Sequence, residues 1–330
     1  MPSTLSVPFH GPWSAVNRRR VFVRVAVAIL TIYAALSVLF VLVTLAPNTD
    51  LAGKLGNAAY AGANVTELRQ MAESYRAARG LDRPIYVRYV GWLVDMTTLH
   101  WGASFTLGAP VVDLVADRLE RTLAYALPGL GLSIALSVVS GLYVANRRGS
   151  LGDTLLRLGG YFVFGLPNFW IAALLLAVTT AASLDHALPP IVYQRVLPAL
   201  LLGTMLFAGQ LSYVRSGVLE QTGRDYLQFL RAKGLSKRAV SWRLLRNVAA
   251  PLVTVFFADL LDVFVVAIYV IEFVFQIPGI GSLTWTAVRN RDMPLLLGTA
   301  IVIVVAGVLA NLVQDLTYGS LDPRTERGES

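Results

Sequence analysis

The 330-residue sequence contains no cysteine, which excludes disulfides, thiolate metal sites and cysteine nucleophiles. It has three histidines, but they lie far apart and form no HExxH pair, so a zincin-type metal site has no support. A GxxxxGK(S/T) stretch is also missing, and the chain therefore carries no phosphate-binding loop of that type. Any ATP-driven step must come from another polypeptide.

Charge is the other scarce feature. Only 15% of the residues are charged, against about 25% in soluble domains, while 55% are hydrophobic. This balance is typical of a membrane protein, and the length allows several spans. The net charge of +8 would suggest nucleic acid as the partner of a soluble protein. In a membrane protein, it instead indicates which loops face the cytoplasm.

Six apolar stretches are long enough for transmembrane helices, which need about 20 residues. They are 25–46, 123–145, 158–182, 196–218, 252–275 and 295–316. The first stretch is longer than the apolar region of about 7–15 residues in a cleaved signal peptide, so we expect a retained helix. In the third stretch, Pro167 is expected to kink the helix, which membrane helices tolerate when neighbours satisfy the freed carbonyl.

Basic residues concentrate in the loops that six spans place on one side of the membrane. The positive-inside rule then puts both termini in the cytoplasm of a multi-pass protein of the cell membrane. The predicted parts are a cytoplasmic amino terminus 1–24, the first helix 25–46, an external lobe 47–118, a transmembrane core 119–318 that includes the cytoplasmic loop 219–250, and a cytoplasmic carboxyl terminus 319–330. In the lobe, TELRQMAESYRAAR (66–79) predicts an amphipathic helix capped by Thr66. A structureless loop of this length would be unusual.

The cytoplasmic loop contains the most unusual segment, DYLQFLRAKGLSKRAVSWRLLRN (225–247), in which six basic residues accompany one acid. Its apolar residues recur with helical spacing on both sides of Gly234. A glycine can end a helix in the left-handed conformation, and Ser236 can cap the next helix. The pattern predicts helix, glycine turn, helix. Two alternatives are a solvated topology anchor and a lipid-headgroup contact, whereas nucleic acid is disfavoured between two membrane spans.

This segment resembles the cytoplasmic coupling loop of binding-protein-dependent ABC import permeases, and more narrowly the first membrane subunit of dipeptide and oligopeptide importers. The family pattern is roughly DYxxxARAKGL followed by RN and P. Other stretches match in order and spacing over about residues 22–324: RGLDRPIYVRYVGWL, WGASF, ANRRGSLGD, GLPNFW, VIEFVFQIPGIGSL, RDMPL and LDPR. Leu230 departs from the family's usual alanine, and the connection around LDHALPPIVYQRVLP is shorter than usual.

The resemblance implies an all-α integral membrane protein with six transmembrane helices of the type I importer permease kind. It implies a second homologous permease subunit, two ATPase subunits that bind ATP and Mg, and an extracytoplasmic substrate-binding protein, with no cofactor on this chain. The residues implied to couple to the ATPase are Asp225, Tyr226, Arg231, Ala232, Lys233, Gly234 and Leu235. The cargo is left open among dipeptides, longer peptides, nickel complexes and some sugars.

Carboxylates inside the fifth apolar stretch are costly in a bilayer and need a reason. Asp259 and Asp262 share a helix face and either line a wet pathway or form a structural pair. Glu272 is expected to fix a turn that also contains Pro278, Gly279 and Gly281. Two rival classes remain: an ion-coupled secondary carrier, for which no internal repeat is evident, and an intramembrane enzyme with an aspartate dyad.

Overall fold

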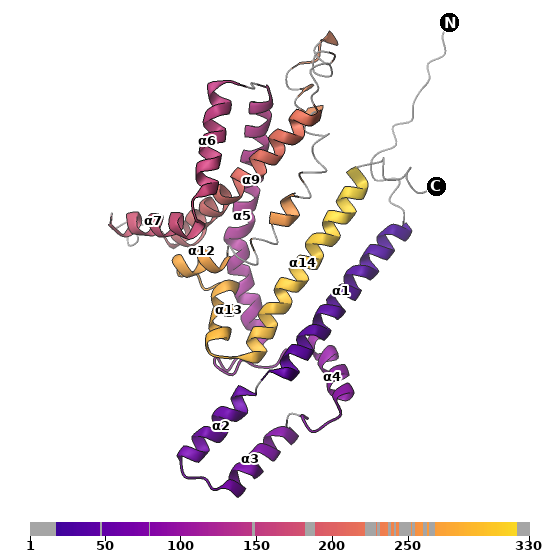
Figure 1. The fold of residues 1–330 in the computed structure, drawn as a ribbon, viewed down its shortest axis with the longest axis vertical. Coiled ribbons are helices and arrows are strands. Elements are labelled where there is room, and N and C mark those ends of the chain that lie inside the picture. Colours follow the sequence, from indigo (N-terminus) through magenta and orange to yellow (C-terminus); the bar gives the residue numbers. More distant parts are fainter. Residues whose placement is uncertain are drawn as a thin grey trace. The chain divides into compact units, whose positions relative to one another are not determined.

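The computed structural model describes residues 18–46, 48–78, 80–146, 149–181, 189–221, 229, 232–236, 239–240, 242–243, 252, 255–259, 263 and 268–321. These residues are helical apart from turns and one isolated antiparallel bridge between Ala103 and Pro110. The all-α prediction is therefore confirmed for the part of the chain that is described (Figure 1).

Among the residues that the structure describes, four helical stretches are long and apolar enough to cross a membrane. They are Val21–Tyr60, Val111–Tyr143, Val192–Gly217 and Met293–Thr317. They cover most of the helices α1 (Arg18–Leu45), α5 (Val111–Asn146), α9 (Leu197–Gln221, preceded by the π-helical turn Val192–Val196) and α14 (Met293–Leu321). Each stretch overlaps one of the predicted spans. Helix α5 begins earlier than predicted, because its charged first turns extend the helix beyond the apolar run.

The third predicted span is two helices rather than one kinked helix. Helix α6 (Leu151–Gly165) has 15 residues and α7 (Asn168–Ala181) has 14, whereas a span needs about 20. The break falls at Pro167, whose carbonyl accepts a hydrogen bond from Trp170 N over 2.8 Å and so starts the new helix. Figure 1 shows α7 running across the direction of α6. A proline disfavours the helical conformation of the residue before it, which ends α6.

The fifth predicted span is described only in part. Helix α12 (Ile268–Val274) forms its end, and α13 (Ile280–Arg289) follows after a tight turn. Helix α13 lies between the fifth and sixth predicted spans, where no helix was predicted. Six spans in total therefore remain a prediction.

Three helices occupy most of the predicted lobe: α2 (Thr49–Tyr60), α3 (Val65–Ala78) and α4 (Ile85–Thr97). Asn64 rather than Thr66 caps α3, because Asn64 Oδ1 accepts from Glu67 N over 3.0 Å while Glu67 Oε2 accepts from Asn64 N over 2.9 Å. This reciprocal pair is a capping box. Helix α2 packs on α3.

Contacts divide the chain into two compact units. One contains Leu119–Ser282 together with the beginning of α1 and the end of α14, and the other contains Ile29–Arg118 and Leu283–Val305. In the second unit, Phe40 of α1 meets the rings of Tyr89 and Trp92 of α4 at 5.2 and 5.6 Å between centroids. These aromatic contacts join α4 to α1 within that unit.

Candidate functional site

The predicted coupling residues lie only partly within the described chain. Asp225, Tyr226 and Arg231 fall outside it. Ala232, Lys233 and Gly234 are exposed, and Leu235 is half-buried. The structure therefore describes the centre of the segment 225–247 and leaves the coupling role of all seven residues a prediction.

Gly234 makes the sharp turn that the sequence predicts. Its φ is +71°, in the left-handed region that favours glycine. A helical hydrogen bond from Lys233 N to Phe229 O, 3.1 Å long, precedes the turn. After it, Ser236 Oγ accepts from Ala239 N over 3.3 Å, and this is the predicted cap. The local helix, glycine turn, helix geometry is present.

The turn presents cationic and aromatic groups together. The Lys233 ammonium lies 4.4 Å from the centre of the Phe229 ring, a cation–π contact. Phe229 and Trp242 are 54% and 70% exposed, whereas Val240 is buried at 3%. Phe229 and Trp242 are thus large apolar side chains exposed within a basic segment.

Glu272 is the centre of a buried hydrogen-bond network. Its side chain accepts from Thr122 Oγ1 over 2.6 Å, from Tyr125 OH over 3.2 Å and from Ser282 N over 2.8 Å. Thr122 Oγ1 also accepts from Ile280 N over 2.9 Å. The carboxylate thereby joins α5, α12 and the first turn of α13.

The turn between α12 and α13 packs closely on this network. A Cβ on Gly279 would collide with the Glu272 carboxylate and the Thr122 hydroxyl, and one on Gly281 would crowd the backbone of Ile268. Pro278 lies between these elements and is half-buried. This geometry supports the turn-fixing role expected of Glu272, which we keep as a proposal.

Of the two aspartates in the fifth predicted span, the structure describes only Asp259. Asp262 lies outside the described residues, while Asp259 is half-buried and accepts a hydrogen bond from Gln210 Nε2 over 2.7 Å. Gln210 is 3% exposed, and its Oε1 accepts from Ser137 Oγ over 3.3 Å. A polar chain therefore runs from α5 through α9 to Asp259. The hydrogen bond from the Gln210 amide is compatible with both roles considered for Asp259. It would satisfy the carboxylate of a structural pair, and it would equally orient a carboxylate that lines a wet pathway.

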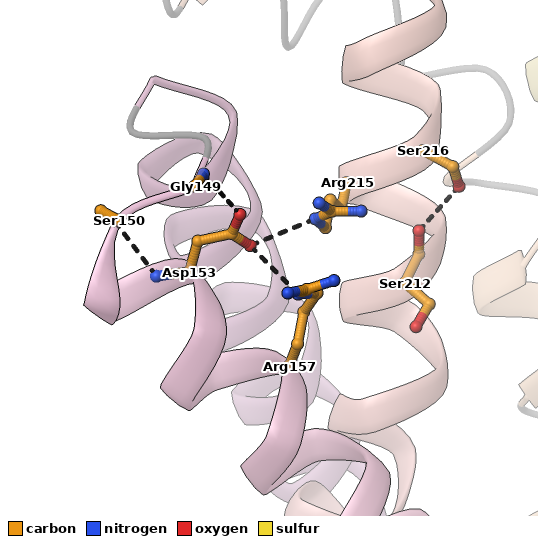
Figure 2. Close-up of polar contacts among 7 residues, drawn as sticks. All are labelled: Gly149, Ser150, Asp153, Arg157, Ser212, Arg215 and Ser216. Carbon is orange, nitrogen blue, oxygen red and sulfur yellow. Dashed lines mark hydrogen bonds and ion pairs between the residues drawn. The ribbon is translucent and has the colours of Figure 1, made fainter.

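Another carboxylate, Asp153, lies at the start of α6 and contacts residues of two helices (Figure 2). Its Oδ2 accepts from Gly149 N over 3.0 Å, and its Oδ1 accepts from Arg215 Nε of α9 over 3.4 Å. Arg157, one turn further along α6, lies 3.6 Å from the same Oδ1. The hydrogen bond from Gly149 and the two guanidinium groups lower the pKa of the Asp153 carboxyl despite its burial.

In the other unit, Asp292 fixes the start of α14 to the connection before α5. It accepts from Ser104 Oγ over 2.6 Å and from Thr106 N over 2.9 Å, both at Oδ2. Leu295 N donates to Oδ1 over 3.3 Å, which makes Asp292 the cap of α14. Burial alone would raise the pKa of Asp292, but these hydrogen bonds outweigh it and hold the pKa below its ordinary value.

Sequence reasoning missed most of these partners. Asp153, Arg215, Asp292, Gln210 and Thr122 were not singled out as site residues. Only Ser-x-x-Asp at 150–153 carries a local signal, that of a capping box. The remaining residues are brought together by helix packing, which leaves no local pattern.

The comparison with known families identifies the class of protein. Residues 137–327 match the family described as "Binding-protein-dependent transport system inner membrane component". The chain therefore belongs to this family of multi-pass inner membrane permeases. It is the membrane component of an ABC import system and not its ATPase, and ATP is bound by the partner subunit.

Relatives of known type cover most of the chain. It is 30% identical to the oligopeptide transport system permease protein AppB of Bacillus subtilis over 78% of this chain and 84% of the relative. It is 31% identical to the probable peptide ABC transporter permease protein y4tP of Sinorhizobium fredii over 87% and 92%. It is also 27% identical to the metal-staphylopine import system permease protein CntB of Staphylococcus aureus over 76% and 80%.

Proposed function

We propose that this permease forms half of a translocation pathway for peptides or a similar small solute, and that the segment 225–247 couples it to an ATPase. A second homologous permease, two ATPases and an extracytoplasmic binding protein complete the complex. The relatives named for oligopeptide and peptide transport support peptide cargo. The relative named for metal-staphylopine import keeps a metal complex as the second candidate.

The observation that carries the coupling proposal is the exposed turn at Gly234. It presents Lys233, Phe229 and Trp242 at the surface between two short helical pieces. A partner shifts a conformation only through contacts that differ between the two states, and these exposed side chains offer such contacts. An ion-coupled carrier would have no use for a cytoplasmic surface of this kind.

Substitution of Gly234 by valine tests the coupling proposal. Gly234→Val strains a left-handed backbone with a β-branched side chain and should reduce copurification of the ATPase subunits. Gly62→Val is the matched control, because Gly62 also has positive φ, +93°, but lies between α2 and α3. Normal ATPase retention and ATP-driven uptake in Gly234→Val would leave the segment as a topology anchor only.

Labelling of introduced cysteines tests the topology, in which six spans place both termini in the cytoplasm and 47–118 outside. Ser74 and Ser236 are both exposed, and the chain has no cysteine of its own. On intact cells, an impermeant thiol reagent should label Ser74→Cys and spare Ser236→Cys. After the cells are opened, both should react. Labelling of both on intact cells contradicts the topology.

A further inference from the structure

The contact between Asp153 and Arg215 joins two helices at the place where the coupling segment begins. Arg215 lies six residues before Gln221, the last residue of α9, so about 9 Å of helix separate it from that end. Helix α6 packs along α9, and Leu211 and Val214 are buried beside the polar contact. A displacement of the end of α9 would therefore act on Arg215 through less than two turns of helix.

The Asp153 carboxylate is fixed before it meets Arg215. Gly149 N holds its Oδ2, and the Asp153 backbone N–H donates to Ser150 Oγ over 3.2 Å, which caps the helix (Figure 2). The side chain of Asp153 is 2% exposed and that of Arg215 is 24% exposed. Because Gly149 binds one carboxylate oxygen and Arg215 the other, the orientation of the Asp153 side chain is fixed. Burial of Asp153 reduces the screening of the ion pair by salt.

Arg157 offers a comparison inside the same cluster. Its Nε is 3.6 Å from the oxygen that Arg215 Nε approaches to 3.4 Å. Both cations stabilise the charge of Asp153, Arg215 through a hydrogen bond and its charge and Arg157 through its charge alone. The two ion pairs differ in the helices that they connect. Arg157 belongs to α6, the helix of Asp153, whereas Arg215 belongs to α9, so only the pair with Arg215 joins two helices.

We propose that Arg215 is a positioning residue for coupling: its ion pair with Asp153 is a strut that makes α6 and the end of α9 move as one body when the ATPase displaces the coupling segment. The proposal rests on the coupling function proposed above for 225–247. Packed side chains, ion pairs and rigid secondary elements can carry coupling between distant sites. The strut extends the motion of one loop to the hairpin of α5 and α6.

Distances between two spin labels test the strut in the assembled complex in membranes. The labels are placed on Leu151→Cys of α6 and Ser216→Cys of α9, both exposed positions in a chain without other cysteines. With Arg215 present, the distance distribution should be the same without nucleotide and with ATP plus vanadate. Arg215→Gln should make the distribution broader and nucleotide-dependent. Arg157→Gln should leave it unchanged, and Arg215→Lys, which keeps the charge, should restore most of the narrow distribution.

Two results overturn the strut. One is a distance that changes with ATP plus vanadate while Arg215 is intact, since the two elements would then move separately. The other is an Arg215→Gln distribution identical to that of Arg157→Gln in both states. If the unsubstituted complex fails to retain its ATPases, the coupling function is refuted instead. The distance distributions of the same variants without nucleotide would then still show whether the ion pair holds α6 and α9 together. If Arg215→Gln does not assemble, the nucleotide comparison with Arg215 intact and the Arg215→Lys variant remain decisive.

Discussion

Thr122 Oγ1 donates a 2.6 Å hydrogen bond to Glu272 Oε1 although 150 residues separate them in the sequence. The same hydroxyl oxygen accepts from Ile280 N over 2.9 Å. Thr122 is fully buried and Glu272 is 1% exposed. One small side chain on α5 thus satisfies both the carboxylate at the end of α12 and the first N–H of α13. The turn that follows the fifth predicted span is thereby built on α5.

Thr122→Val tests this double role, because valine keeps the shape and removes the hydroxyl. It removes the hydrogen bond that Ile280 N–H donates to Thr122 and takes one donor from Glu272, so we expect a loss of about 1–3 kcal/mol. Thr179→Val is the control, since the Thr179 hydroxyl bonds only to carbonyls of its own helix. Thermal unfolding of the detergent-purified chain measures both variants. Equal small shifts would mean that the Thr122 bridge contributes little.

Gly279→Ala tests the close approach of the turn to Glu272. The added Cβ would collide with the carboxylate and with the Thr122 hydroxyl, and overpacking of this kind costs about 1–3 kcal/mol. Gly56→Ala is the comparison, because a Cβ there meets nothing within 4 Å. Inside a helix, alanine is favoured over glycine by about 0.5–1 kcal/mol. Thermal unfolding should therefore separate the two variants in opposite directions, and a Gly279→Ala variant as stable as the parent chain would contradict the described turn.

Asp292 makes the stability of its unit depend on pH. Its folded pKa lies below the ordinary value, so its stabilising effect is complete above the unfolded value of about 3.9 and is lost as the pH falls through the folded pKa. At pH 7, Asp292→Asn should cost about 1–2 kcal/mol through weakened bonds to Ser104 and Thr106. The difference in unfolding temperature from the parent chain should shrink below about pH 4.

The control for this titration is Asp95→Asn, because Asp95 is exposed on α4. Unfolding curves between neutral and acid pH should show little difference between this variant and the parent chain at any pH. A gap between the parent chain and Asp292→Asn that stays constant down to acid pH would show that the Asp292 carboxylate does not contribute through its charge.

The sequence predicted what depends on local pattern and missed what depends on pairing. The length of the apolar stretches predicted the regions of α1, α5, α9 and α14. Gly234 and Ser236 predicted the turn and the helix cap, because a few neighbouring residues determine such features. Thr122, Arg215 and Ser104 look like ordinary residues of their segments. Their partners lie 150, 62 and 188 residues away, and one sequence shows no sign of which helix faces meet.

Pro167 shows a second limit. A proline removes one donor and crowds the preceding turn, and a membrane helix either bends around it or ends there. The outcome depends on what packs against the freed carbonyl. In this chain, the Pro167 carbonyl starts α7 by accepting from Trp170 N, so the helix ends and a new one begins. The residues on either side gave no local indication of which of the two outcomes applies.

Asp259 gives the last prediction, which separates a pathway lining from a structural pair. The carboxylate is half-buried and held by Gln210 Nε2, while Ser137 behind the amide is 1% exposed. If Asp259 lines a wet pathway, Asp259→Cys in the assembled complex should react with a water-soluble thiol reagent. Ser137→Cys is the matched control, because it is nearly isosteric and should stay protected. Reaction of Asp259→Cys should also change when ATP plus vanadate is added, since a pathway alternates between its two sides. Protection of both cysteines in every nucleotide state would make the contact between Gln210 and Asp259 a structural pair.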